Sequence, residues 1–334
     1  MVDVEAWRTA LGTDATGWLL DGDEPGVRAA ALTDLLDRPP DDPDIAASRR
    51  AVMGTDVVRR IMAAQRDDGH WAEPDRFYRD KYHGTVWQLI LLAALGADGA
   101  DDAVRAGCEA VLRDGQHRES GAFGFDRSTT AGGARASTVI PCLTGNLAWA
   151  LVRLGMRDDD RVQAALAWIA TYQRFDTDGP APSGWPYRSE PCWGRHTCHM
   201  GAVKALKALA AVPPAARTAP MQRTIDAGVD YLLRHHVHKR CHDPSLVAKP
   251  GWLRLGYPLM YQTDVLEVLG VLTSLGVRDE RMAEAVDLVV AKADDAGRLP
   301  LETTVNGKTF ARVEVKGRPS RWLTLEALRV LRAW

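Results

Sequence analysis

The segment from His83 to Gly96 reads HGTVWQLILLAALG and sets the pattern on which the rest of the chain is built. It starts with small and polar residues, continues with apolar residues at helical spacing and ends at a glycine. A glycine at that position favours a helix stop, because it tolerates the left-handed conformation just past a helix end. The same polar start and apolar run return in four later segments, of which the first two also close on a glycine: Cys142 to Gly155, Thr263 to Gly276, Thr197 to Ala210 and Ser320 to Leu331. The interval of roughly 55 to 66 residues is typical of two helices and a substantial loop per repeat.

A second type of helix alternates with these segments. It places apolar residues at three- and four-residue steps on one side and ends in a turn, often an Asp-Gly pair. The ranges are Val57 to Gln65, Ala103 to Arg113, Arg161 to Gln173 and Arg281 to Lys292. No segment shows sustained alternation with a period of two, so the sequence predicts an all-α chain.

Composition excludes several classes of function. The 42 Lys and Arg residues against 44 Asp and Glu residues give a net charge of −2, which disfavours a nucleic-acid-binding face. The most apolar stretch, Val86 to Leu95, has about half the length that a membrane helix needs, so no transmembrane segment is expected. No secretory signal is visible at the amino terminus, and the five cysteines are expected to be reduced. We therefore expect a cytoplasmic protein.

One of the turns carries a family resemblance. Gln65-x-x-Asp68-Gly69-x-Trp71 resembles the glutamine–tryptophan motif of squalene–hopene cyclases, and Gln173 with Gly184-Trp185 looks like a stretched copy. The chain is similar to a bacterial group of squalene-cyclase-like proteins through these segments: Lys81 to Trp87, Cys142 to Asn146, His196 to Cys198 and Ser320 to Trp322.

This resemblance to the squalene-cyclase and prenyltransferase superfamily implies a fold. The family forms an α/α toroid, here a double ring of about five to six helical hairpins around a cavity. Residues 1–334 would be a single domain, with residues 1–54 as N-terminal helices that complete the ring. The resemblance also implies an apolar small-molecule substrate of isoprenoid type.

The acid of the class II cyclases is the point at which the sequence departs from the family. Their Asp-x-Asp-Asp motif supplies the middle aspartic acid as the proton donor to an alkene or epoxide. The corresponding register here is Tyr261-Gln262-Thr263-Asp264, and threonine cannot supply that acidity. Asp264 is therefore the candidate acid, with Tyr261 and His83 as further candidate catalytic residues. The alternative role of Asp264 is a helix N-terminal carboxylate.

A cluster of cysteine and histidine suggests different chemistry. Cys192 to His199 contains four potential metal ligands, and Cys142 falls at the same repeat position as His83. Zinc prefers such ligands, and protein prenyltransferases and lanthipeptide cyclases, which resemble this architecture, hold a zinc ion. Helix amino termini also lower the pKa of thiols. We predict Cys142, Cys198 and His199 as zinc ligands; the alternative is that the thiols are buried packing groups.

Aromatic residues on the repeated segments are the candidates for substrate contact. Trp87, Trp149 and Trp322 are expected to face the cavity, either stabilising a cation through their π faces or forming an apolar wall. The early residues of the inner helices are expected to line this cavity: His83, Cys142, Cys198, Tyr261, Asp264 and Trp322.

Three functional hypotheses follow. The first is a terpenoid-cyclase or prenyltransferase-superfamily enzyme acting on a largely apolar, isoprenoid-type molecule without the usual acid motif. The second is a zinc-dependent enzyme that activates a thiol or water. The third is a non-catalytic toroid that binds a ligand.

Overall fold

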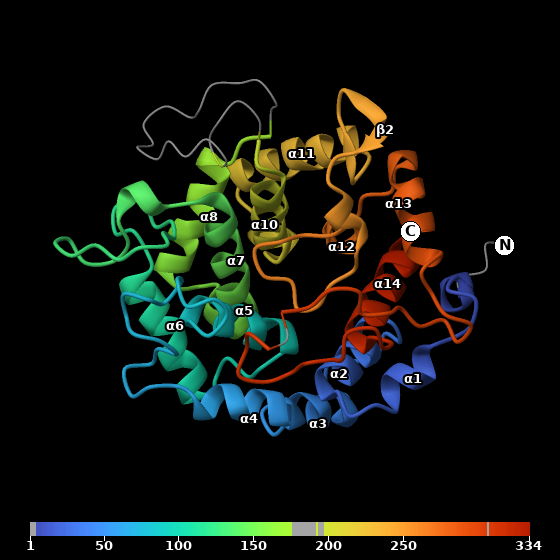
Figure 1. Ribbon diagram of the computed structural model, residues 1–334, viewed down its shortest axis with the longest axis horizontal. Helices are drawn as coiled ribbons and strands as arrows, with labels where there is room; N and C mark the ends of the chain where they lie inside the picture. The colour runs from blue at the N-terminus through green and yellow to red at the C-terminus, as the bar shows by residue number, and fades with distance from the viewer. Residues whose placement is uncertain (1–4, 176–191, 193–196, 306) are drawn as a thin grey trace.

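The computed structural model describes residues 5–175, 192, 197–305 and 307–334. The described chain is mostly helical, as the sequence predicts, and its helices follow one another around the middle of the molecule (Figure 1). The repeated apolar segments form α5 (Thr85–Leu95), α7 (Pro141–Leu151), α10 (His199–Ala210), α12 (Val265–Ser274) and α14 (Arg321–Ala333).

These five helices form the inner part of the fold. Each contacts the next in the order α5, α7, α10, α12 and α14. In α5 every residue except Ala94 is buried, as expected of a helix that is apolar on all sides. The helix stops at Gly96, whose φ of +78° is the left-handed conformation that glycine adopts without strain.

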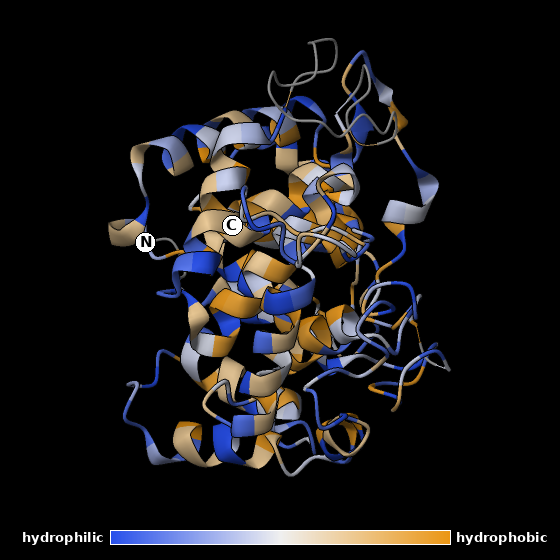
Figure 2. Cartoon of the chain, turned by 90° about the vertical axis from the view of Figure 1, so that its left-hand side faces the viewer, coloured by the Kyte–Doolittle hydropathy of each residue, from blue (hydrophilic) through white to orange (hydrophobic). Residues whose placement is uncertain are grey.

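The second helix type lies outside the first. It comprises α4 (Asp56–Ala63), α6 (Asp102–Asp114), α8 (Asp160–Tyr172), α11 (Ala219–Arg234) and α13 (Ala283–Val290). Contacts join α6 to α5, α8 to α7, α11 to α10 and α13 to α12. Hydrophilic and hydrophobic bands alternate along the helix ribbons of Figure 2, as amphipathic helices require.

The N-terminal helices are α1 (Thr16–Leu20), α2 (Pro25–Asp34) and α3 (Pro43–Val52). Helix α2 lies beside α14, which brings the two ends of the chain together (Figure 1). A Cβ atom at Gly26 would lie 2.4 Å from the carbonyl oxygen of Leu95 and 2.9 Å from the ring of Trp322. Helix α2 therefore packs closely against both the end of α5 and the start of α14.

One small sheet departs from the predicted all-α chain. Strand β1 (Lys239–Arg240) pairs antiparallel with β2 (Asp243–Val247), with Lys239 opposite Val247. Short 3₁₀ turns lie at Ala6–Thr9, Ala136–Thr138, Pro214–Ala216, Pro250–Leu253 and Glu280–Met282, and a π turn lies at Val152–Met156. The hairpin has too few residues for its alternation to be visible in sequence.

Glutamine side chains connect successive outer helices. Gln65 Nε2 donates hydrogen bonds to the carbonyl oxygens of Gly69 and Ala103, which joins the end of α4 to the start of α6. Gln116 makes the equivalent contacts to Gly121 and Arg161, at the start of α8. Sequence analysis identified Gln65 but missed Gln116, whose partner aromatic residue is a phenylalanine. The predicted copy at Gly184-Trp185 lies outside the described residues.

A threonine on the inner helices makes a second repeated contact. The Oγ1 atoms of Thr85, Thr144 and Thr324 accept hydrogen bonds from the backbone N–H groups of Trp71, Phe123 and Leu299 respectively. Each bond holds the turn after an outer helix against an inner helix.

None of the helices in the described part of the chain has the length and apolarity needed to cross a membrane.

Candidate functional site

A cavity of about 500 Å³ lies between the inner helices and α2. Its volume falls in the range of small-molecule sites. Part of its wall is apolar, with Trp149, Leu266 and Trp322 among the largest side chains. Another part carries charged side chains, among them Arg153, Glu326 and Arg329, so the cavity can hold a ligand that has both an apolar part and a polar group.

The cavity lies mainly between the carboxyl ends of the inner helices, whereas sequence analysis placed it at their amino ends. Leu95 and Gly96 close α5, Ala211 follows α10, and Ser274 ends α12; all four line the cavity. Asp264, Trp149 and Trp322 also line it, whereas His83, Cys142, Cys198, Tyr261 and Trp87 do not.

Aromatic packing at the amino ends explains this difference. The ring of Trp87 lies 5.1 Å from Tyr78, 5.2 Å from Tyr82 and 6.1 Å from Tyr261, measured between ring centroids. The Lys81 ammonium lies 4.5 Å from the centroid of Tyr261. These side chains fill the space beside the starts of α5 and α12. His83 lies against Phe310 at 4.6 Å.

Asp264 is the buried acid of the cavity wall. It caps α12, where Oδ1 accepts a hydrogen bond from the backbone N–H of Glu267 at 2.9 Å, and Oδ2 accepts one from Gly256 at 2.8 Å. Only 2% of Asp264 is exposed. Burial, with the negative charge of Glu267 as a further cause, raises the pKa of Asp264 to about 7 although the two N–H groups oppose the shift. A carboxyl with that pKa is partly protonated at neutral pH.

Two lysines neutralise the carboxylate next to it. Lys204 Nζ lies 2.6 Å from both carboxylate oxygens of Glu267, and Lys207 Nζ lies 2.9 Å from Oε1. Burial acts to raise the pKa of Glu267, but the two ammonium groups outweigh it and hold this pKa at about 2. Burial lowers the pKa of Lys204 to about 8, although the carboxylate of Glu267 acts against the shift. Lys207 Nζ also lies 4.0 Å from the ring centroid of Trp149 on the cavity wall.

A stacked aromatic pair forms another part of the wall. The rings of Tyr257 and Trp322 are 5.0 Å apart and almost parallel, at 7°. Tyr257 donates its hydroxyl hydrogen to the carbonyl oxygen of Ala94 at 3.2 Å, and burial raises its pKa, which keeps it neutral. Trp322 Nε1 has no hydrogen-bond partner among the described residues. The π faces of this pair are suited to an apolar or cationic group.

The predicted zinc ligands divide into two groups. The Cys142 and Cys198 thiols lie near each other, and Cys192 lies near Cys142. His199 instead stacks on Trp252, with ring centroids 4.2 Å apart, and its two ring nitrogens have no hydrogen-bond partner in the described structure.

The described residues do not bring three metal donors together. Burial, together with the neighbouring thiols, raises the pKa of Cys142 to about 12, which disfavours the thiolate that zinc requires. The expectation that a helix amino terminus lowers this pKa is therefore wrong, since loss of solvent outweighs the helix dipole. Within the described residues no three His, Cys, Asp or Glu side chains could hold a metal ion. Residues 193–196, with His196 of the predicted cluster, lie outside the described residues.

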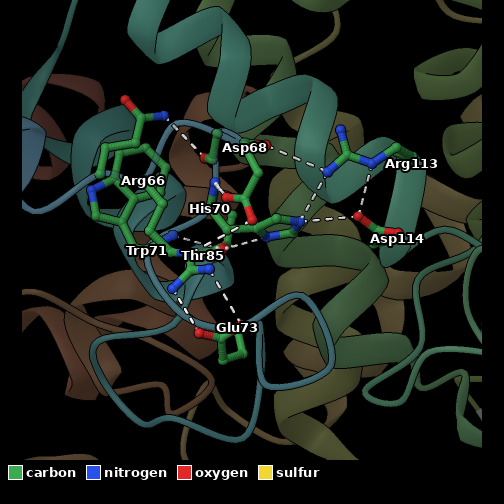
Figure 3. A network of polar contacts seen from close by, with 10 residues as sticks. Arg66, Asp68, His70, Trp71, Glu73, Thr85, Arg113 and Asp114 are labelled. Carbon is green, nitrogen blue, oxygen red and sulfur yellow. Dashed lines mark hydrogen bonds and ion pairs between the residues drawn. The ribbon is translucent and has the colours of Figure 1, made fainter.

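Figure 3 shows a polar network that the sequence did not reveal, and none of its residues His70, Thr85 and Asp114 lines the cavity. His70 Nδ1 lies 2.9 Å from Thr85 Oγ1, and His70 Nε2 lies 3.0 Å from Asp114 Oδ2. A hydroxyl, an imidazole and a carboxylate in this order resemble a catalytic triad in geometry. However, neither His70 nor Thr85 has any exposed surface, so a substrate cannot reach them. The network holds the turn after α4 against α5 and α6.

Comparisons with known proteins give a distant structural likeness. No family model matches the chain, and no curated protein matches it. Among solved structures, the type II terpene cyclase MstE from Scytonema, in its apo form, is 14% identical with a TM-score of 0.31; the match covers 86% of this chain and 97% of that chain. Another structure of this cyclase holds geranylgeranyl dihydroxybenzoate as substrate and matches with the same identity and TM-score. A protein from Actinoplanes is 11% identical with a TM-score of 0.29, over 86% of this chain and 98% of that chain. Similarity at this level carries no conclusion about activity, which has to be inferred from the chain's own residues.

Proposed function

We propose that this protein is a terpenoid-cyclase-like enzyme that protonates a largely apolar, isoprenoid-type molecule in its central cavity, with Asp264 as the acid. The observation that carries the proposal is a carboxyl group, 2% exposed and with a pKa of about 7, on the wall of a cavity of about 500 Å³. Such a group can hold a proton at neutral pH next to a bound apolar ligand.

The proposal includes an α/α toroid formed by one domain, residues 1–334. The successive contacts of α5, α7, α10, α12 and α14 around the cavity support it. The close approach of Gly26 to Leu95 and Trp322 supports a role of residues 1–54 in closing the ring.

The chemistry of the proposed step is a proton transfer. The Asp264 proton adds to one carbon of an alkene, which leaves a carbocation on the substrate and a carboxylate on Asp264. The N–H groups of Glu267 and Gly256 already point at the carboxylate oxygens and stabilise the charge that forms there. The π faces of Trp149 and of the Tyr257–Trp322 pair are placed on the cavity wall to stabilise the cation. Loss of a proton from the cyclised cation to the carboxylate restores the acid.

Turnover of acyclic isoprenoids tests the proposal. The purified chain is incubated with C10 to C30 polyprenyl compounds, and cyclic products are measured by gas chromatography with mass spectrometry. We expect Asp264→Asn to lower turnover by at least about a hundredfold, because general acid catalysis contributes on that order.

The matched control is Asp101→Asn. Asp101 caps α6 through Oδ1, which accepts hydrogen bonds from Ala103 and Val104, but it does not line the cavity. Asp101→Asn should keep wild-type turnover. Wild-type turnover by Asp264→Asn, with the helical circular dichroism signal intact in both variants, would contradict the proposal.

A further inference from the structure

Four charged side chains, Asp34, Arg153, Glu326 and Arg329, line the cavity near the carboxyl ends of α2 and α7. All of them except Arg153 form ion pairs within the described part of the chain. Arg329 pairs with Asp34 and with Glu326, the latter at 3.1 Å. Arg153 lies in the π turn after α7 and also lines the cavity, but it makes no hydrogen bond or ion pair within the described part of the chain. One guanidinium therefore faces the cavity without a counter-ion.

Positive charge is in excess around Arg153. Arg153 keeps an exposed surface, but the partial loss of solvent on its cavity side lowers its pKa. The neighbouring guanidiniums of Arg329 and Arg49 lower this pKa further, while the carboxylates of Asp34 and Glu326 raise it. Arginine remains charged under these conditions because its ordinary pKa is above about 12. Three guanidinium groups thus share this region with two carboxylates, and an anion there would balance the charge.

The two ends of the cavity differ in access to solvent. Arg153 is exposed, whereas Asp264 is buried. Apolar side chains, among them Trp149 and Trp322, form part of the cavity wall together with Arg153 and Asp264. A ligand with a charged head and an apolar tail would leave its head near solvent and place its tail against the buried acid.

Building on the proposed function, we propose that the ligand of this cavity is an amphiphile with an oxyanion head, a carboxylate or a phosphate, bound by Arg153. A guanidinium offers two parallel N–H groups to such an oxyanion, which a neutral hydroxyl cannot match. The isoprenoid tail extends over Trp149 toward the Tyr257–Trp322 pair and Asp264.

Isothermal titration calorimetry with three C15 compounds that differ only in the head group tests this inference. The probes are farnesol, farnesoic acid and farnesyl phosphate, each titrated into the full chain. We expect the two anionic compounds to bind about tenfold tighter than farnesol, and Arg153→Gln to abolish that difference. The two anionic probes distinguish a carboxylate head from a phosphate head, and tighter binding of either supports the inference.

The matched control is Arg157→Gln, four residues further along the chain. Arg157 pairs with Asp158 at 2.8 Å and does not line the cavity, so this variant should keep the preference. Equal affinity of the wild-type chain for all three compounds, or a preference that survives Arg153→Gln, would overturn the inference and leave the proposed function intact. Failure of all three compounds to bind would instead overturn the proposed function together with the inference.

Discussion

At the scale of single residues, burial decides the chemistry of this protein. Asp264 and Cys142 both lie at the start of a helix, where an exposed acid or thiol would have a lowered pKa. In the folded chain the pKa of Asp264 is instead raised to about 7 and that of Cys142 to about 12. Loss of solvent penalises the charged form of both groups more than the helix terminus favours it. Asp264 is thereby suited to hold a proton, and Cys142 stays a neutral thiol at neutral pH.

The raised pKa of Asp264 predicts how stability changes with pH. In the unfolded chain this carboxyl ionises above about pH 4, whereas in the folded chain it ionises only above about pH 7. Between these values the folded state binds the extra proton, so raising the pH favours unfolding. Relative to Asp264→Asn, the free energy of unfolding of the wild-type chain should fall by about 3 kcal/mol from pH 5 to pH 8. Urea denaturation of both proteins at the two pH values measures this difference, and a constant difference would show that Asp264 is ionised throughout.

At the scale of elements, contacts between helices constrain single positions more than helix propensity does. Gly17 in α1 and Gly26 in α2 are both helical glycines, and propensity alone favours alanine at each of them. A Cβ atom at Gly17 would have no neighbour within 4 Å, whereas at Gly26 it would overlap the backbone of Leu95. The two positions therefore separate packing from propensity.

We expect the corresponding alanine variants to change stability in opposite directions. Gly26→Ala should destabilise the fold by about 1–3 kcal/mol, because the end of α5 has to move. Gly17→Ala should stabilise it by up to about 1 kcal/mol, because alanine loses less backbone entropy. Thermal or urea unfolding measures both effects. A Gly26→Ala variant as stable as the wild type would mean that α2 does not pack this closely against α5.

At the scale of the whole molecule, the cavity depends on elements that are far apart in the chain. Asp34 of α2, Arg153 after α7 and Arg329 of α14 all line it. Residues 1–54 contribute α2 and α3, whose buried side chains include Val27, Leu32 and Ile45. The wall of the cavity thus depends on the first helices as much as on the last.

Removal of residues 1–54 tests this dependence. Each large apolar side chain lost from the core costs about 1.5–3 kcal/mol, which in sum is of the order of the whole stability of a domain. We expect the truncated chain to lose its cooperative thermal transition, which the full chain should show as a single step. A truncated chain that unfolds cooperatively at the temperature of the full chain would show that the remaining helices form an independent domain.

Local patterns in the sequence were sufficient to predict the alternation of two helix types, the stop of α5 at Gly96 and the capping of α12 by Asp264. These features depend on residues within one or two turns of each other, which is the range over which helical periodicity and capping act. The location of the cavity, the pairing of Lys204 with Glu267 and the high pKa of the Cys142 thiol depended on the tertiary structure. They arise where residues more than 50 positions apart exclude water together, and neither spacing nor composition records which side chains will meet there.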